Sequence, residues 1–123
     1  MAMTVMEMVA EAKSHIREVN VQEAQAMLGK VLVLDVREPS EYAGGCLPGA
    51  ANIPRGVLEF KIDGHPGFQG QRDAEILVYC LSGGRSALAV DTLQKLGWSN
   101  AVSLAGGLTA WTQAGAATVA PSV

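Results

Sequence analysis

Reactive and flexible residue types are concentrated in one short segment, Cys80-Leu81-Ser82-Gly83-Gly84-Arg85-Ser86. A cysteine thiolate is a strong nucleophile, and neighbouring N–H groups and cations favour it over the neutral thiol. Gly83 and Gly84 let the backbone curl through conformations that other residues avoid. Such a curl turns several N–H groups toward one point, where they bind an anion, and Arg85 adds a fixed positive charge. The segment is therefore typical of a loop in which a thiolate attacks an anionic reactant.

A second interpretation of the segment is purely structural: a buried cysteine ends a strand and two glycines make a turn. We favour the functional interpretation, because so many reactive and flexible residues lie together at a predicted strand–helix junction. Cys80 is then the candidate nucleophile, with its sulfur exposed inside a ring of backbone donors. The candidate anion cradle consists of Leu81, Ser82, Gly83, Gly84, Arg85 and Ser86.

The elements around this segment alternate between strand and helix, which predicts an α/β fold with a mainly parallel sheet. Residues 31–34 and 76–79 are uninterrupted apolar runs, as in central strands buried on both faces. Ligands bind beyond the carboxyl ends of parallel strands, and Cys80 directly follows the second run. We expect further strands at 16–19, 50–54 and 101–104, and helices at 21–28, 40–42, 55–62, 86–96 and 108–113.

Length and composition narrow the classes of protein. The 123 residues fit one domain, and 49% of them are apolar while 17% are charged, which disfavours disorder. The net charge of −3 argues against nucleic acid as the main partner. No uncharged apolar run reaches the roughly 20 residues needed to cross a bilayer, so we expect no membrane partner. Two cysteines are too few for a disulfide framework.

The two ends of the chain are expected to lie outside the main domain. Residues 1–15 are predicted to form a helical extension, residues 16–115 the domain, and residues 116–123 a loose tail. The start of the chain lacks a basic segment, and Glu7 and Glu11 interrupt its apolar residues, so we expect no secretory signal and a cytoplasmic location. Methionines at 1, 3, 6 and 8 form an adaptable apolar face, where a homodimer contact is one expectation.

Four segments, in this order, resemble the motifs of the single-domain rhodanese family, and the resemblance extends over roughly residues 16–115. The segments are Leu34-Asp35-Val36-Arg37-Glu38-Pro39 with Glu41-Tyr42, Gly45-Cys46-Leu47-Pro48-Gly49-Ala50-Ala51-Asn52-Ile53-Pro54, Val78-Tyr79-Cys80-Leu81-Ser82-Gly83-Gly84-Arg85-Ser86 and Leu104-Ala105-Gly106-Gly107-Leu108-Thr109-Ala110-Trp111. The resemblance implies a three-layer α/β/α domain with a mainly parallel central sheet.

The resemblance also implies an activity, that of a thiosulfate sulfurtransferase. Cys80 would attack the outer sulfur of thiosulfate or a related small anionic donor and become a persulfide. A thiophilic acceptor would then take the sulfur: cyanide in an assay, and a thiol or a protein in the cell. The family needs no metal and no organic cofactor for this reaction. The alternative that we keep is a persulfide carrier or regulatory module with little turnover of its own.

A phosphatase or arsenate reductase is a third hypothesis, because such enzymes have related loops. Tyrosine and dual-specificity phosphatases place five residues between the cysteine and the arginine, and the phosphatase and arsenate-reductase relatives of the rhodaneses also have the longer loop. Only four residues separate Cys80 from Arg85 here. The shorter loop favours a sulfur atom over the larger phosphoryl group.

Residues at the end of the first central strand are expected to support the fold. By resemblance, Asp35 and Arg37 brace the region near the loop through hydrogen bonds. Glu38 and Glu41 are interpreted as solvated charges at a helix start.

Two further residues have two interpretations each. Arg55 follows a motif that borders the pocket in related proteins, so its charge suits a dianionic donor; an ordinary surface arginine is the alternative. Cys46 stands where the family usually has histidine. We interpret Cys46 as a small residue that fills its site, and a second thiol that resolves the Cys80 persulfide is the alternative.

Overall fold

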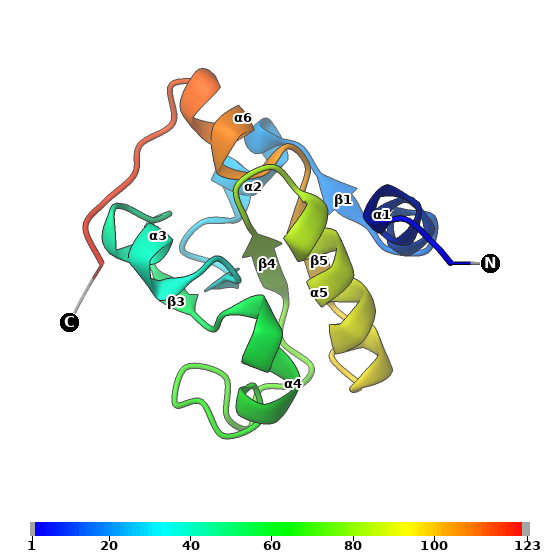
Figure 1. The fold of residues 1–123 in the computed structure, drawn as a ribbon. Helices are drawn as coiled ribbons and strands as arrows, with labels where there is room; N and C mark the ends of the chain where they lie inside the picture. Colours follow the sequence, from blue (N-terminus) through cyan, green and yellow to red (C-terminus); the bar gives the residue numbers. More distant parts are fainter. Residues whose placement is uncertain (1, 122–123) are drawn as a thin grey trace.

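The computed structural model describes residues 2–121 and contains a five-stranded sheet in which all strand pairs are parallel. The strand order is β1-β5-β4-β2-β3 (Figure 1). The strands are β1 (Glu18–Val19), β2 (Leu32–Asp35), β3 (Ala50–Asn52), β4 (Ile76–Tyr79) and β5 (Ala101–Leu104). Both central apolar runs are therefore strands, as expected, and they pair directly with each other.

Helices cover both faces of the sheet, which confirms the α/β/α architecture. Residues of α4 (Leu58–Lys61) and α5 (Gly84–Lys95) pack in one apolar cluster, and residues of α2 (Val21–Met27) and α6 (Gly107–Gln113) pack in another. A short helix, α3 (Pro39–Ala43), connects β2 to β3, and a 3-10 turn at Arg55–Val57 leads into α4.

Alternation along the strands decides which cluster each side chain joins. In β2 and β4, Leu34 and Val78 belong to the cluster on the α5 face, whereas Leu77 and Tyr79 belong to the cluster on the α6 face. Cys80 continues the alternation and packs on the α5 face. The reactive segment thus begins on the face that α5 covers.

Local signals set the start of α2 as expected. The Asn20 side chain accepts a hydrogen bond from the Glu23 amide, and the Glu23 carboxylate accepts one from the Asn20 amide. This reciprocal cap satisfies two N–H groups that a helix start leaves free.

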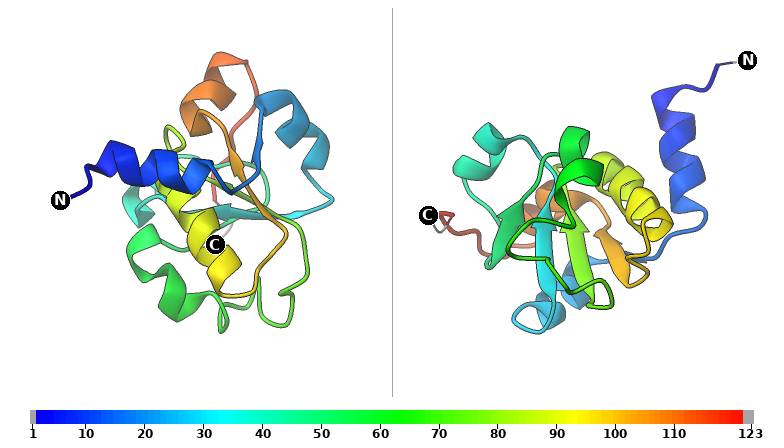
Figure 2. Two further views of the ribbon diagram at one scale, coloured as in Figure 1. Left: turned by 90° about the vertical axis from the view of Figure 1, so that its right-hand side faces the viewer. Right: turned by 90° about the horizontal axis from the view of Figure 1, so that it is seen from below.

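The N-terminal helix, α1 (Val5–Lys13), lies beside α5 and outside the sheet (Figure 2). Ala12 is buried, and a Cβ atom on Gly84 would lie 3.7 Å from Val9, so α1 also borders the Cys80 segment. Met3, Val5, Met6 and Met8 remain exposed. Within residues 2–121, no helix has both the length and the apolar character that a membrane span requires.

The prediction of a loose tail was wrong for the residues that follow α6 up to 120. Val119 and Cys46 exchange two backbone hydrogen bonds of 2.9 Å, and the Trp111 indole donates to the Ala117 carbonyl. Figure 1 shows this segment running from α6 toward α3 and β3. The small residues let the backbone lie close to its neighbours. Residues 122 and 123 lie outside the described residues.

A buried network links the ends of β2 and β4 on the α6 face. The Arg37 guanidinium donates to both oxygens of Asp35 at 2.7–3.1 Å and to the Gly45 carbonyl, while Tyr79 donates its hydroxyl to Asp35 at 2.7 Å. Asp35 is 0% exposed and Arg37 is 3% exposed. Burial and the Asp35 carboxylate raise the pKa of Tyr79, so its hydroxyl stays protonated and donates. Buried charges persist only when partners satisfy them in this way.

Tyr79→Phe tests the network. Its hydroxyl also accepts from the Leu47 amide at 3.1 Å, so the variant leaves that buried amide without its partner. Asp35 loses one donor but keeps those of Arg37. We expect the free energy of unfolding in urea to fall by about 1–3 kcal/mol. The matched control is Tyr42→Phe, which removes one hydrogen bond to the Ala50 carbonyl at a half-buried site and should cost about 1 kcal/mol or less. Equal losses in the two variants would contradict the importance assigned to the network.

Candidate active site

The segment from Cys80 to Ser86, called the Cys80 loop below, curls around the cysteine sulfur. The amides of Gly83 and Ser86 donate to Cys80 Sγ at 3.1 and 3.3 Å, and the Ser86 hydroxyl oxygen lies 3.5 Å from Sγ. Gly83 has φ +101°, which only glycine adopts readily. The helix α5 starts at Gly84, two residues earlier than the sequence predicted, because the loop passes directly into it.

The expectation of an exposed sulfur was wrong. Cys80 is 1% exposed and packs with apolar side chains such as Val36 and Val78. The loop backbone folds over the sulfur, while Leu81 and Ser82 at its tip are exposed. The sulfur is therefore almost completely covered by the protein.

The start of α6 holds the first part of the loop in place. The amides of Leu108 and Thr109 donate to the carbonyls of Cys80 and Leu81 at 2.8 and 2.9 Å. In a planar trans peptide the C=O of one residue and the N–H of the next point in opposite directions. Since these two carbonyls point to α6, the N–H groups of Leu81 and Ser82 point away from it. The motif at residues 104–111 thus orients the motif that contains Cys80.

Gly107 makes this contact possible. It has φ +57°, and a Cβ atom at this position would lie 2.6 Å from the carbonyl oxygens of both Cys80 and Leu81. Gly83 meets the same turn, because a Cβ there would lie 3.2 Å from the Gly106 amide. Only glycine therefore allows the turn before α6 to lie this close to the loop.

Several loop amides keep their donors free. Among residues 2–121, the N–H groups of Leu81, Ser82, Gly84 and Arg85 donate no hydrogen bond. The latter two belong to the first turn of α5, where a helix leaves its N–H groups unpaired. The loop thus offers free donors next to two that already bind the sulfur.

The interpretation of Glu41 as a solvated charge was wrong. Its carboxylate accepts two hydrogen bonds from the Arg85 guanidinium, at 2.8 and 3.1 Å, and a third from the Glu38 amide. These contacts lower the pKa of Glu41 from 4.5 to about 2. The tertiary fold brings α3 to the loop, so the charge of Arg85 is balanced by a carboxylate at the rim.

The other predicted residues lie elsewhere. Asp35 and Arg37 belong to the network on the α6 face, opposite to the face on which Cys80 packs. Arg55 donates to Glu59 at 3.1 Å and to Thr92 at 2.9 Å. Thr92 follows Ser86 by six residues on α5, about 9 Å along the helix. A contact between Arg55 and the donor stays a prediction.

Cys46 is buried at 2% exposure and is a free thiol, like Cys80. Burial and the neighbouring Asp35 carboxylate raise the pKa of Cys46, so it stays a neutral thiol. It lines a hollow of about 340 Å³ together with Tyr42, His65 and Val119. These observations agree with a residue that fills its site.

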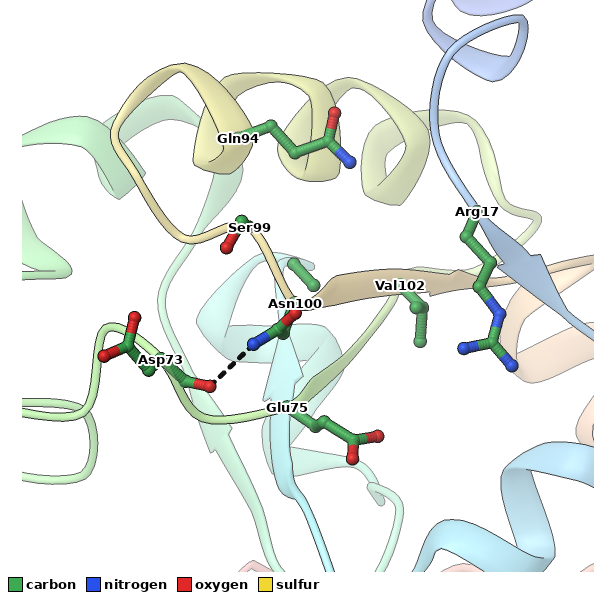
Figure 3. Close-up of a pocket in the computed structure, with 8 residues that line it drawn as sticks. Arg17, Asp73, Glu75, Gln94, Ser99, Asn100 and Val102 are labelled. Carbon is green, nitrogen blue, oxygen red and sulfur yellow. Dashed lines mark hydrogen bonds between the residues drawn. The ribbon is translucent and has the colours of Figure 1, made fainter.

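A larger hollow, of about 560 Å³, lies at the opposite end of the sheet, where β4 and β5 begin (Figure 3). Arg17 and Glu75 line it, and the Asn100 side chain donates to the Asp73 carbonyl at 2.7 Å. No residue of the Cys80 loop lines this hollow. Within residues 2–121, no three His, Cys, Asp or Glu side chains form a group that could hold a metal ion.

A family model described as the Rhodanese-like domain matches residues 20–114. The chain belongs to the rhodanese family. The match begins after α1 and includes the Cys80 loop, the motifs at residues 34–42 and 45–54, and the turn before α6. Membership confirms the resemblance seen in the sequence and supports a sulfurtransferase role in general terms.

Similar rhodanese-like proteins include sulfurtransferases. A sulfurtransferase of Allochromatium vinosum is 34% identical over 74% of this chain and 80% of its own length. A human thiosulfate:glutathione sulfurtransferase is 32% identical over 76% of this chain and 90% of its own length. A solved structure from Rhodopseudomonas palustris, of unknown function and described as a possible tyrosine phosphatase, has 32% identity and a TM-score of 0.85, covering 97% of this chain and 96% of its own.

Gly107→Ala tests the contact between the turn and the loop. Gly115→Ala is the matched control, because Gly115 also has a positive φ (+78°) but no atom lies within 4 Å of its Cβ position. Both variants carry the backbone strain of a left-handed residue, about 1–2 kcal/mol, but only Gly107→Ala displaces the Cys80 and Leu81 carbonyls. We expect Gly107→Ala to lower the rate of Cys80 alkylation by at least about tenfold, or 1.4 kcal/mol, while Gly115→Ala leaves it nearly unchanged. Equal rates in the two variants would refute the orienting role of the turn.

Glu41→Gln tests the ion pair through its pH dependence. A carboxylate whose pKa is lowered on folding stabilises the folded state above its unfolded pKa, and this contribution is lost as pH falls through the folded pKa. For Glu41 the window runs from 4.5 down to about 2. We expect the difference in free energy of unfolding between wild type and Glu41→Gln, measured in urea, to shrink as the pH falls through this window. When both proteins also carry Arg85→Met, this pH dependence should largely disappear. A difference that does not change with pH when Arg85 is present would count against the ion pair.

Proposed function

We propose that this chain is a thiosulfate-type sulfurtransferase that carries a sulfane sulfur as a persulfide on Cys80. The observation that carries the proposal is the Cys80 loop, in which two amides bind the sulfur and four further amides have no hydrogen-bond partner among the described residues. Convergent backbone donors stabilise an anion without needing to reorganise. Both the thiolate and the persulfide are anionic sulfur species, which such donors stabilise.

The reaction proceeds in two displacement steps. The Cys80 thiolate attacks the outer sulfur of the donor, for instance thiosulfate. A bond forms between Sγ and that sulfur, while the bond to the sulfite group breaks and its electron pair leaves with sulfite. An acceptor nucleophile, such as a thiolate or cyanide, then attacks the terminal sulfur, and Sγ departs as the thiolate. Covalent transfer of this kind gives ping-pong kinetics.

Amides of the loop stabilise the negative charge on sulfur in both steps. The amides of Gly83 and Ser86 hold the attacking and leaving sulfur. The amides that remain free, those of Leu81, Ser82, Gly84 and Arg85, bind the terminal sulfur of the persulfide. Because Cys80 is almost fully buried, donors that present one slender terminal sulfur reach it more readily than bulky donors. No step requires a metal or an organic cofactor.

Two related roles are alternatives to the sulfurtransferase. The loop suits a phosphatase less well, and it suits a persulfide carrier equally well. Phosphate hydrolysis is disfavoured, because four residues separate Cys80 from Arg85 and the guanidinium is bound to Glu41. A persulfide carrier or regulatory module with little turnover uses the same chemistry at Cys80. The acceptor in that case is a partner protein rather than a small thiol.

Mass spectrometry after incubation with thiosulfate tests the proposal. We expect the peptide that contains Cys80 to gain the mass of one sulfur atom, because the loop stabilises the persulfide. Cys80→Ser should gain nothing, whereas the matched variant Cys46→Ser should load like the wild type. Loading on Cys46 alone, or no loading at all, would contradict the nucleophile assigned here.

A turnover assay separates the enzyme from the carrier. Thiocyanate is followed with thiosulfate and cyanide, and the assay is repeated with a thiol acceptor. Sustained turnover that Cys80→Ser abolishes supports the enzyme. Rapid loading without turnover supports the carrier, and release of phosphate from p-nitrophenyl phosphate would favour the phosphatase.

A further inference from the structure

A chain of two hydroxyl groups runs from the sheet to the cysteine sulfur. Ser103 Oγ lies 2.8 Å from Ser86 Oγ, which lies 3.5 Å from Cys80 Sγ. Ser86 and Ser103 are both 0% exposed. Ser103 was not among the candidate residues of the sequence, since a lone serine in an apolar strand carries no recognisable pattern.

Sheet register explains how Ser103 reaches this position. In the parallel ladder, Ser103 of β5 lies opposite Val78 of β4, so both side chains point to the α5 face. Ser86 occupies the first turn of α5, directly above that face. The hydroxyl of Ser103 therefore meets that of Ser86 from the side of the sheet.

The hydrogens of this chain can all be satisfied when the sulfur is an anion. Ser103 then donates to Ser86, and Ser86 donates to Sγ, so that both hydroxyl hydrogens have acceptors. A neutral thiol also permits the reverse direction, in which Cys80 Sγ donates to Ser86. If its S–H donates to Ser86, then Ser86 donates to Ser103, and the Ser103 hydrogen has no other acceptor among residues 2–121. Leaving a buried hydroxyl hydrogen unpaired is unfavourable.

We propose that Ser103 is a positioning residue, whose hydroxyl orients that of Ser86 so that Ser86 donates to the Cys80 sulfur anion. Polarisation along the chain strengthens the second hydrogen bond. The inference rests on the proposed function in that it takes Cys80 as the reacting thiol. The charge of Arg85 also acts on Cys80, and Arg85 forms an ion pair with Glu41. Both residues stay unchanged in the test.

The test measures the rate of Cys80 alkylation by iodoacetamide against pH, in a Cys46→Ser background so that one thiol reacts. We expect Ser103→Ala to move the midpoint of the profile upward by about half a pH unit or more, a threefold or greater change in ionisation constant. Ser86→Ala should move it at least as far. Because Ser103 acts through Ser86, the double variant should match Ser86→Ala alone.

Val102→Ala is the matched control for lost packing. Val102 precedes Ser103 on β5, but its side chain belongs to the cluster on the α6 face. It should lower the melting temperature without moving the midpoint. An unchanged midpoint in Ser103→Ala, or shifts of the two serine variants that add in the double variant, would overturn the proposal.

A second measurement, the loading of sulfur from thiosulfate onto the same variants, tests the proposed function separately from the role of Ser103. If wild type and variants all fail to load, the sulfurtransferase proposal fails, while the alkylation profiles still decide the role of Ser103. If all load and the profiles coincide, only the role of Ser103 is refuted.

Discussion

The site depends on two hydrogen bonds between backbone groups, from the start of α6 to the carbonyls of Cys80 and Leu81. Because a peptide unit is planar, these bonds orient the amides that follow, and the loop turns its donors inward. The bonds form only because Gly107 allows the two backbones to touch. A segment more than twenty residues away along the chain thereby prepares the surroundings of the cysteine sulfur.

The groups that contact the sulfur directly are uncharged dipoles. Arg85 is paired with Glu41 at the rim, and Arg37 is paired with Asp35 on the far face of the sheet. What contacts Sγ itself is a pair of amides and one hydroxyl. Such groups suit the proposed mechanism, in which the sulfur alternately attacks, carries a second sulfur and leaves, since a strong fixed cation would hold the anion in one state.

Much of this protein could be predicted from local pattern. The apolar runs identified β2 and β4, Asn20 and Glu23 identified the start of α2, and the position of Cys80 after a buried strand identified the loop. The wrong predictions have a common cause, which is that each depends on contacts between segments distant in sequence. These contacts pair Glu41 with Arg85, bury Cys80 and attach the tail at Cys46. No local pattern encodes them.

The order of the elements, the parallel sheet and the choice of Cys80 as the candidate nucleophile followed from the sequence, because hydrophobic periodicity, capping and glycine placement act over a few residues. Which amides contact the sulfur, and how deeply it is buried, followed from the tertiary structure alone. It also decided that Ser103 joins the site while Arg55 is bound to Thr92 and Glu59. These features depend on strand register and on how helices pack across the sheet, which arise from the whole chain at once.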